Sequence, residues 1–101
     1  MGQYTKKNPV TKTRAKFKEP ENSRVILLND NYTAMNFVVE ILMSIFHKNY
    51  EDANRIMMDV HRNGKGTVGV YPNDIALTKT EQVHTAARDN EFPLRCVVEP
   101  L

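Results

Sequence analysis

The 101-residue sequence predicts one α+β domain in which strands and helices follow the order β-α-α-β-α-β. Short runs typical of strands occur at three places, "RVILLN", "GKGTVGVY" and "LRCVVE". The segments between them have apolar residues at three- and four-residue spacing, which is typical of helices. A chain of this length builds a single core, so we expect one sheet with the helices packed on one face.

The first 22 residues predict a flexible basic extension that precedes a core domain spanning residues 23–101. This segment has neither apolar period and contains Pro9 and Pro20. Residues 1–24 have seven Lys/Arg and two Glu, whereas residues 25–101 have seven Lys/Arg and ten Asp/Glu. Dispersed basic charge of this kind is compatible with nucleic-acid binding. A solvated extension explains it equally well, because the segment has few residues to bury.

Composition also indicates the cellular compartment of the protein. The first 24 residues contain no apolar segment typical of a signal peptide. The longest uncharged run, residues 31–39, is far shorter than the roughly 20 residues that span a membrane. The lone Cys96 cannot form an intrachain disulfide. We therefore expect a cytoplasmic protein that does not contact a membrane.

The first ordered elements are a strand and a helix. The run "RVILLN" predicts a strand that begins near Ser23. Thr33 is expected to cap a helix from Ala34 to about Phe46, because a Thr hydroxyl accepts hydrogen bonds from free N–H groups at a helix start. One stripe of this helix is apolar and contains Met35, Val38, Val39, Leu42, Ile45 and Phe46.

A second helix is predicted after Asn49, which is a suitable N-cap. Glu51 and Asp52 fall in its first turn, where negative charge complements the helix dipole. We expect this helix to end at Gly64, a residue type that favours the left-handed conformation found after helices. Its apolar stripe contains Ala53, Ile56, Met57, Val60 and His61.

The remaining elements are a strand, a helix and a strand. "GKGTVGVY" predicts the strand, and Gly69 within it indicates close approach by another group. Pro72 stops this strand and suits the start of a helix that continues to about Asn90. After Pro93 the chain returns to a strand that ends at Pro100. The stripe of the third helix contains Ile75, Ala76, Lys79, Val83, Ala86 and Ala87.

The sequence does not favour an enzyme. Separations of 14, 23 and 12 residues between His47, His61, His84 and Cys96 match no short metal-binding motif. "GKGTVG" precedes a strand, so it lacks the helix start that phosphate loops use. Cys96 lies in a strand pattern, where a buried, unreactive thiol is expected. We predict neither a metal site nor a cofactor.

The polar cluster of Asn29, Asp30 and Asn31 suggests a binding site. If the first two helices lie side by side, their apolar stripes form the walls of a small pocket, with this cluster and His61 at its rim. Carboxylate, amide and imidazole groups offer acceptors, which suit the three donors of an ammonium group. The pattern thus fits a free peptide N-terminus with an apolar first side chain. Spacing alone favours the simpler interpretation, a polar turn with Met35 and Met57 in the core and His61 at the surface.

Four stretches, "VILLNDNYTAMNFVVEIL", "ANRIMMDVHRNGKGTVGVY", "DIALTKTEQV" and "ARDNEFPLRC", resemble the ClpS family. ClpS proteins are adaptors of the Clp ATP-dependent protease that recognise N-degrons. The resemblance extends from about Arg24 to Pro100 and implies a three-stranded antiparallel sheet with three helices. It also implies a non-enzymatic protein that binds substrates beginning with Leu, Phe, Tyr or Trp.

The resemblance further implies roles for individual residues. Asn29 and His61 would hydrogen-bond the substrate α-amino group, and Asp30 and Asn31 would contribute nearby or through water. Met35 resembles a gate that excludes β-branched first residues. The side-chain pocket would be lined by Thr33, Met35, Val38, Met57, Val60 and Leu94.

The resemblance implies protein partners rather than nucleic acid. Asp74 and Lys79, taken as exposed charges on the third helix, match positions that dock on the N-terminal domain of a Clp ATPase of the ClpA or ClpC type. The extension of residues 1–22 resembles the segment through which the family hands substrate to the unfoldase. This displaces the nucleic-acid interpretation of its charge, although a ribosome- or nucleic-acid-associated domain remains the alternative. We expect a monomer.

The chain departs from the family at the rim. The family usually shows "NDDYTPMEF", where this sequence has "NDNYTAMNF". Asn31 removes one negative charge, which should weaken attraction to an ammonium group. Ala34 and Asn36 replace a Pro and a Glu that would define the helix start.

Overall fold

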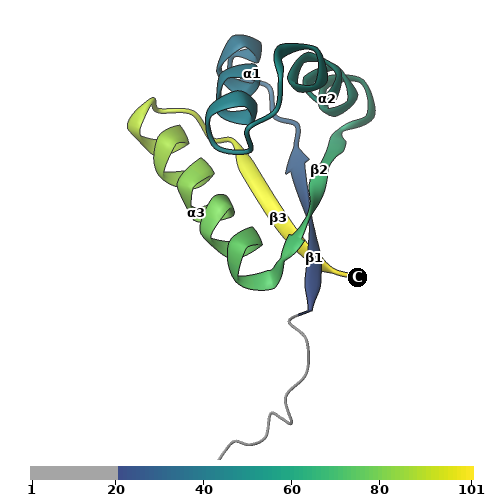
Figure 1. The fold of residues 1–101 in the computed structure, drawn as a ribbon. Helices are drawn as coiled ribbons and strands as arrows, with labels where there is room; N and C mark the ends of the chain where they lie inside the picture. Colours follow the sequence, from purple (N-terminus) through teal and green to yellow (C-terminus); the bar gives the residue numbers. More distant parts are fainter. Residues whose placement is uncertain (1–20) are drawn as a thin grey trace, which may run out of the picture.

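The computed structural model describes residues 21–101, so the predicted extension falls almost entirely outside the described residues. The chain forms β1 (Asn22–Leu28), α1 (Met35–Ser44), α2 (Tyr50–Asn63), β2 (Lys65–Pro72), α3 (Asn73–Asp89) and β3 (Arg95–Pro100). This is the predicted order, and the α+β fold class is confirmed (Figure 1). β1 begins at Asn22, one residue before the predicted start.

The three strands form one antiparallel sheet in the order β2-β1-β3. The register between β1 and β2 shifts between Val25 and Ile26, where Val25 pairs with Gly69 and Ile26 with Thr67. This irregularity is a β-bulge, which increases local twist. The central strand β1 supplies Val25 and Leu27, both fully buried, to the face that the helices cover.

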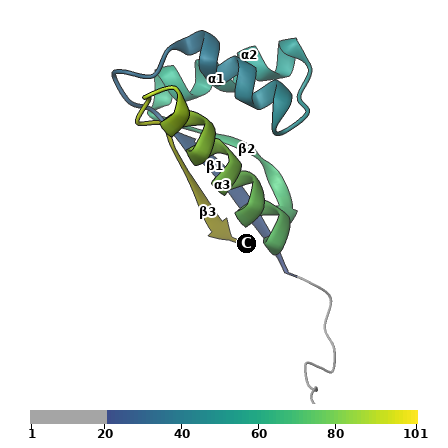
Figure 2. The ribbon, with the colours of Figure 1, turned by 90° about the vertical axis from the view of Figure 1, so that its left-hand side faces the viewer.

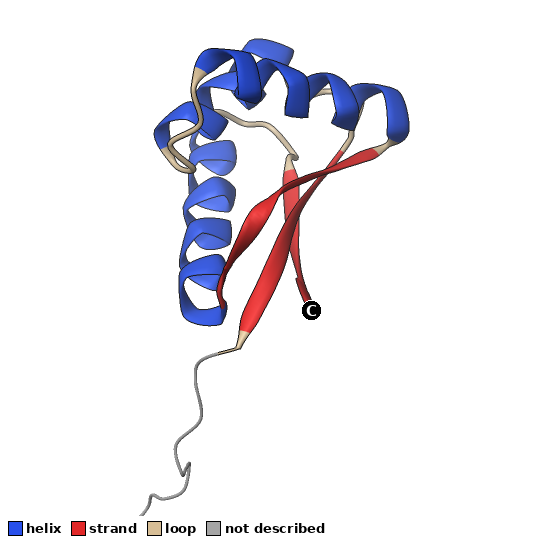
Figure 3. Cartoon of the chain, turned by 45° about the vertical axis from the view of Figure 1, so that its right-hand side comes forward, coloured by secondary structure: helices blue, strands red, loops and turns tan. Residues whose placement is uncertain are grey.

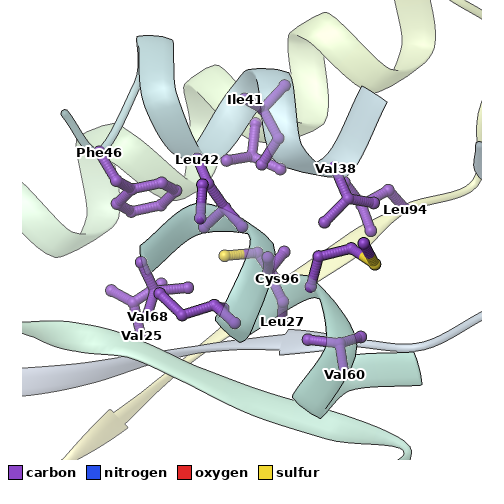
Figure 4. Packing of buried hydrophobic residues seen from close by; sticks show 14 of the residues in the cluster. Val25, Leu27, Val38, Ile41, Leu42, Phe46, Val60, Val68, Leu94 and Cys96 are labelled. Atoms are coloured by element: carbon purple, nitrogen blue, oxygen red, sulfur yellow. The ribbon is translucent and has the colours of Figure 1, made fainter. Parts of the chain in front are cut away.

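The helices cover one face and one end of the sheet. α3 runs alongside the strands, whereas α1 and α2 lie across the end of the sheet where β1 finishes and β2 starts (Figures 1, 2 and 3). Side chains from all three helices and all three strands meet in one core. Figure 4 shows its centre, where Leu27, Leu42, Val68 and Cys96 lie close together.

Both ends of α2 agree with the prediction. The Asn49 side chain accepts a hydrogen bond from the Asp52 N–H at 2.8 Å. At the other end Gly64 has φ of 87°, in the left-handed region that glycine adopts without strain. Strong local end signals thus define this helix.

The predicted start of α1 is wrong. Thr33 is not the N-cap, because Ala34 occupies that position and no side chain caps the helix. The Thr33 hydroxyl instead donates to the Asp30 carboxylate at 2.7 Å. The far end also differs: α1 ends at Ser44, and Phe46 is buried in the core beyond it.

The predictions for the second half need smaller corrections. Pro72 is the last residue of β2 and the N-cap of α3, rather than its first helical residue. Ile75 lies on the predicted apolar stripe but is 42% exposed. A Cβ added at Gly69 would lie 3.1 Å from the Tyr71 hydroxyl oxygen, so the predicted close approach at this glycine is confirmed.

Candidate functional site

All ten predicted pocket and rim residues line one cavity of about 220 Å³. It lies where the end of β1, the following loop, α1, α2 and the residue before β3 meet. An engineered cavity of about 150 Å³ in another protein accepts benzene, so this volume suits one large side chain rather than a drug-sized ligand. The ten residues are Asn29, Asp30, Asn31, Thr33, Met35, Val38, Met57, Val60, His61 and Leu94.

The inner wall of the cavity is apolar. Val38 from α1, Met57 and Val60 from α2, and Leu94 before β3 are each less than 10% exposed. Figure 4 shows Val38 and Leu94 beside each other and Val60 below them. Met35 differs because 44% of its surface is exposed, so it stands at the mouth. An apolar side chain that entered would be desolvated on several sides.

A backbone hydrogen bond brings the two sides of the rim together. The Asn29 N–H donates to the carbonyl oxygen of Gly64 at 2.9 Å, which joins the end of β1 to the end of α2. His61 lies three residues before Gly64, in the last turn of α2. The αL conformation of Gly64 therefore helps position Asn29 beside the helix turn that carries His61.

Asp30 organises the loop between β1 and α1. Its carboxylate accepts from the Tyr32 N–H at 2.8 Å, the Thr33 N–H at 2.7 Å and the Thr33 hydroxyl at 2.7 Å. Burial by itself raises the pKa of Asp30, but these three hydrogen bonds outweigh it, so the pKa is lowered. Asp30 thus stays ionised and gives the rim a fixed negative charge.

The other rim groups are an imidazole and two side-chain amides. Within residues 21–101 the side chains of Asn29, Asn31 and His61 form no hydrogen bond with another residue. They can offer two amide oxygens and an imidazole nitrogen to a ligand. With the nearby Asp30 carboxylate, the rim is suited to a cationic donor group.

Sequence reasoning missed Leu28, which also lines the cavity. Leu28 is the last residue of β1 and directly precedes Asn29. Its place at the end of the apolar run, beside the polar cluster, was the available signal.

The two predicted docking residues lie apart from the cavity, on α3. Asp74 is exposed, and its carboxylate accepts from the Ile75 N–H at 2.9 Å. Lys79 is half-buried, contrary to the expectation of an exposed charge. Its Nζ donates to the Ile45 carbonyl oxygen at 2.7 Å and lies 5.8 Å from the Phe46 ring centroid.

His84 and Cys96, which were considered for metal or nucleophile chemistry, contact each other within the folded domain. The His84 Nε2 accepts from the Cys96 N–H at 3.0 Å. Burial raises the pKa of the Cys96 thiol to about 11, which makes it a weak nucleophile. Within residues 21–101, no three His, Cys, Asp or Glu residues are grouped so as to hold a metal ion. No helix in that range is both long and apolar enough to cross a membrane.

Comparison with known proteins gives a consistent answer. Residues 18–97 match the sequence profile of the family described as ATP-dependent Clp protease adaptor protein ClpS. The ClpS adapter protein of Acetivibrio thermocellus is 58% identical over 88 residues, which cover 87% of this chain and 89% of that protein. The ClpS of Syntrophus aciditrophicus is 61% identical over 84 residues, covering 83% of this chain and 78% of that one.

A solved structure extends the likeness to three dimensions. The structure of Agrobacterium tumefaciens ClpS2 bound to L-phenylalaninamide is similar with a TM-score of 0.79 and 36% identity. The match covers 82% of this chain and all of that chain. The family consists of adaptor proteins, which agrees with the prediction that this chain is not an enzyme. The chain belongs to the ClpS family of ATP-dependent Clp protease adaptor proteins.

Proposed function

We propose that this ClpS-family adaptor binds the free N-terminus of substrates whose first residue is Leu, Phe, Tyr or Trp and delivers them to a Clp AAA+ ATPase for unfolding and proteolysis. The observation that supports this most strongly is the combination of an apolar wall and an acceptor-rich rim in one cavity. Its volume matches one large side chain, and its rim matches an ammonium group. L-phenylalaninamide, bound by the related ClpS2, combines both features.

In this proposal the rim binds the α-amino group. Asn29 and His61 accept hydrogen bonds from the ammonium group, and Asp30 and Asn31 contribute nearby. Thr33, Met35, Val38, Met57, Val60 and Leu94 surround the first side chain. An acetylated N-terminus has lost its charge and two donors, so it makes fewer hydrogen bonds to the rim acceptors and loses the attraction to the Asp30 carboxylate.

The ATPase partner binds elsewhere on the adaptor. We place Asp74 and Lys79 of α3 at the contact with the N-terminal domain of a ClpA- or ClpC-type ATPase, because neither residue lines the cavity and the two surfaces can be occupied together. The adaptor acts as a monomer in the cytoplasm. One surface thus holds substrate while another holds the unfoldase.

Fluorescence anisotropy with labelled peptides that differ only in the first residue tests the substrate proposal. Free Leu, Phe, Tyr and Trp termini should bind, whereas Ser or Glu termini and the N-acetylated Leu peptide should bind at least about tenfold more weakly. His61→Ala should weaken binding, and Arg62→Ala, an exposed neighbour that does not line the cavity, is the matched control. Equal binding of free and acetylated peptides would overturn the proposal.

A further inference from the structure

A second hollow of about 470 Å³ lies between α1 and α2, directly beside the cavity. Met35 and Met57 line both, so the two hollows adjoin at these side chains. The hollow is open and shallow compared with the cavity, and we call it the α1–α2 groove. Its walls include Val39 and Met43 from α1 and Tyr50 from α2.

The α1–α2 groove is apolar although it faces solvent. Met35 is 44% exposed, Met43 is 40% exposed and Tyr50 is 61% exposed. Large apolar side chains gathered at one exposed site commonly mark a surface for a binding partner. Because the groove adjoins the substrate cavity, we consider the substrate polypeptide as this partner.

Geometry decides how much of a substrate the groove can hold. A polypeptide held by its first residue must continue across the mouth of the cavity, where Met35 stands. Met35 and Met43 are eight residues apart on α1, a rise of about 12 Å along the helix. An extended peptide rises about 3.3 Å per residue, so the groove spans about three to four peptide residues.

We propose that the α1–α2 groove binds substrate residues two to four and favours apolar side chains among them. This inference rests on the proposed function and adds a second determinant of substrate choice. Glu40 is the one carboxylate lining the groove, and no Lys or Arg of the described chain lines it. Acidic substrate residues at these positions are therefore disfavoured.

The test uses Leu-initiated peptides in a Gly/Ser background, with a single additional Leu at position two, three, four or seven. At least one of positions two to four should bind about fivefold more tightly than the background peptide, and position seven should not. Met43→Ser and Tyr50→Ser should remove this gain. Leu77→Ser on α3, an equally apolar exposed site outside the groove, should preserve it.

The outcomes separate this inference from the proposed function. Met43 does not line the cavity, so Met43→Ser should bind the background peptide as the wild-type chain does. If the background peptide binds and no gain appears at positions two to four, the groove proposal is wrong and the proposed function stands. The groove proposal is also wrong if the gain survives in both groove variants. If no Leu-initiated peptide binds, the proposed function fails and this inference fails with it.

Discussion

Lys79 on α3 donates through its Nζ to the carbonyl oxygen of Ile45, at the C-cap of α1, over a distance of 2.7 Å. The same ammonium lies 5.8 and 5.9 Å from the ring centroids of Phe46 and Tyr71. One cation thus satisfies a carbonyl group at the end of α1 and contacts two aromatic rings. Lys79 therefore links α3 to the helix that forms part of the cavity wall.

Lys79→Met, which keeps the length of the side chain and removes its charge, should lower the free energy of unfolding by about 1–2 kcal/mol. Glu81→Gln, at an exposed position of the same helix, should change it by less than about 0.5 kcal/mol. Urea denaturation measures both. Equal stability of the two variants would show that the Lys79 contacts contribute nothing.

A comparison of Lys79→Met with Asp74→Asn separates the folding role of Lys79 from docking. Asp74→Asn should weaken binding to the ATPase N-terminal domain with little change in stability, because Asp74 is exposed. Lys79→Met should weaken both. Isothermal titration calorimetry with that domain provides the comparison, and undiminished affinity in Asp74→Asn would remove this residue from the contact.

Asn31→Asp adds a carboxylate to the rim. Asn31 is exposed and lines the cavity, so the added charge should strengthen binding of a Leu-initiated peptide by roughly threefold at low salt. The gain should shrink at high ionic strength because the site is solvent-exposed. Peptide titration at two salt concentrations measures this. An equal gain for the N-acetylated peptide would contradict the electrostatic explanation.

Met35→Ala should broaden the choice of first residue. Met35 stands half-exposed at the mouth of the cavity, and the prediction assigns it the role of a gate that excludes β-branched first residues. Removing it should reduce the preference for Leu over Ile by about tenfold. Competition between Leu- and Ile-initiated peptides measures the ratio. An unchanged ratio would assign the exclusion of β-branched residues to another part of the cavity.

Acid should loosen the loop that Asp30 organises. The pKa of Asp30 is lowered from its ordinary value of 3.8, so the folded state binds its proton less readily than the unfolded state does. The stabilisation is present above pH 3.8 and is lost as the pH falls through the folded-state value. Between about pH 5 and pH 2, the stability of Asp30→Asn should therefore fall less than that of the wild-type chain. Asp59→Asn, at an exposed carboxylate in α2, is the control that should follow the wild-type chain.

Local sequence signals predicted the elements well where one residue had one role. Asn49 and Gly64 defined both ends of α2 because capping chemistry depends on a few neighbouring residues. Thr33 misled the prediction because its hydroxyl has a nearer competing partner, Asp30. Phe46 lies on the helical stripe yet is buried outside the helix, since tertiary packing rather than helix periodicity determines its place.

The residues of the site were largely predictable from the sequence, whereas the contacts between distant elements were not. The cluster of Asn29 to Asn31, the Met-containing stripes and His61 at the rim were visible in the sequence, and the resemblance to ClpS added Leu94. Lys79 lay on the predicted apolar stripe, but its hydrogen bond was not visible, because its partner Ile45 lies 34 residues away. Pairings at that separation depend on how the helices cross, which no local pattern specifies.

Gly66, in β2, lies directly behind a residue of the cavity wall. A Cβ atom at this position would lie only 2.9 Å from Cγ2 of Val60, whose side chain forms part of the apolar wall. A larger residue at this position would therefore displace the Val60 side chain. The shape of the apolar wall thus depends on a glycine in the sheet behind the cavity, which does not itself line the cavity.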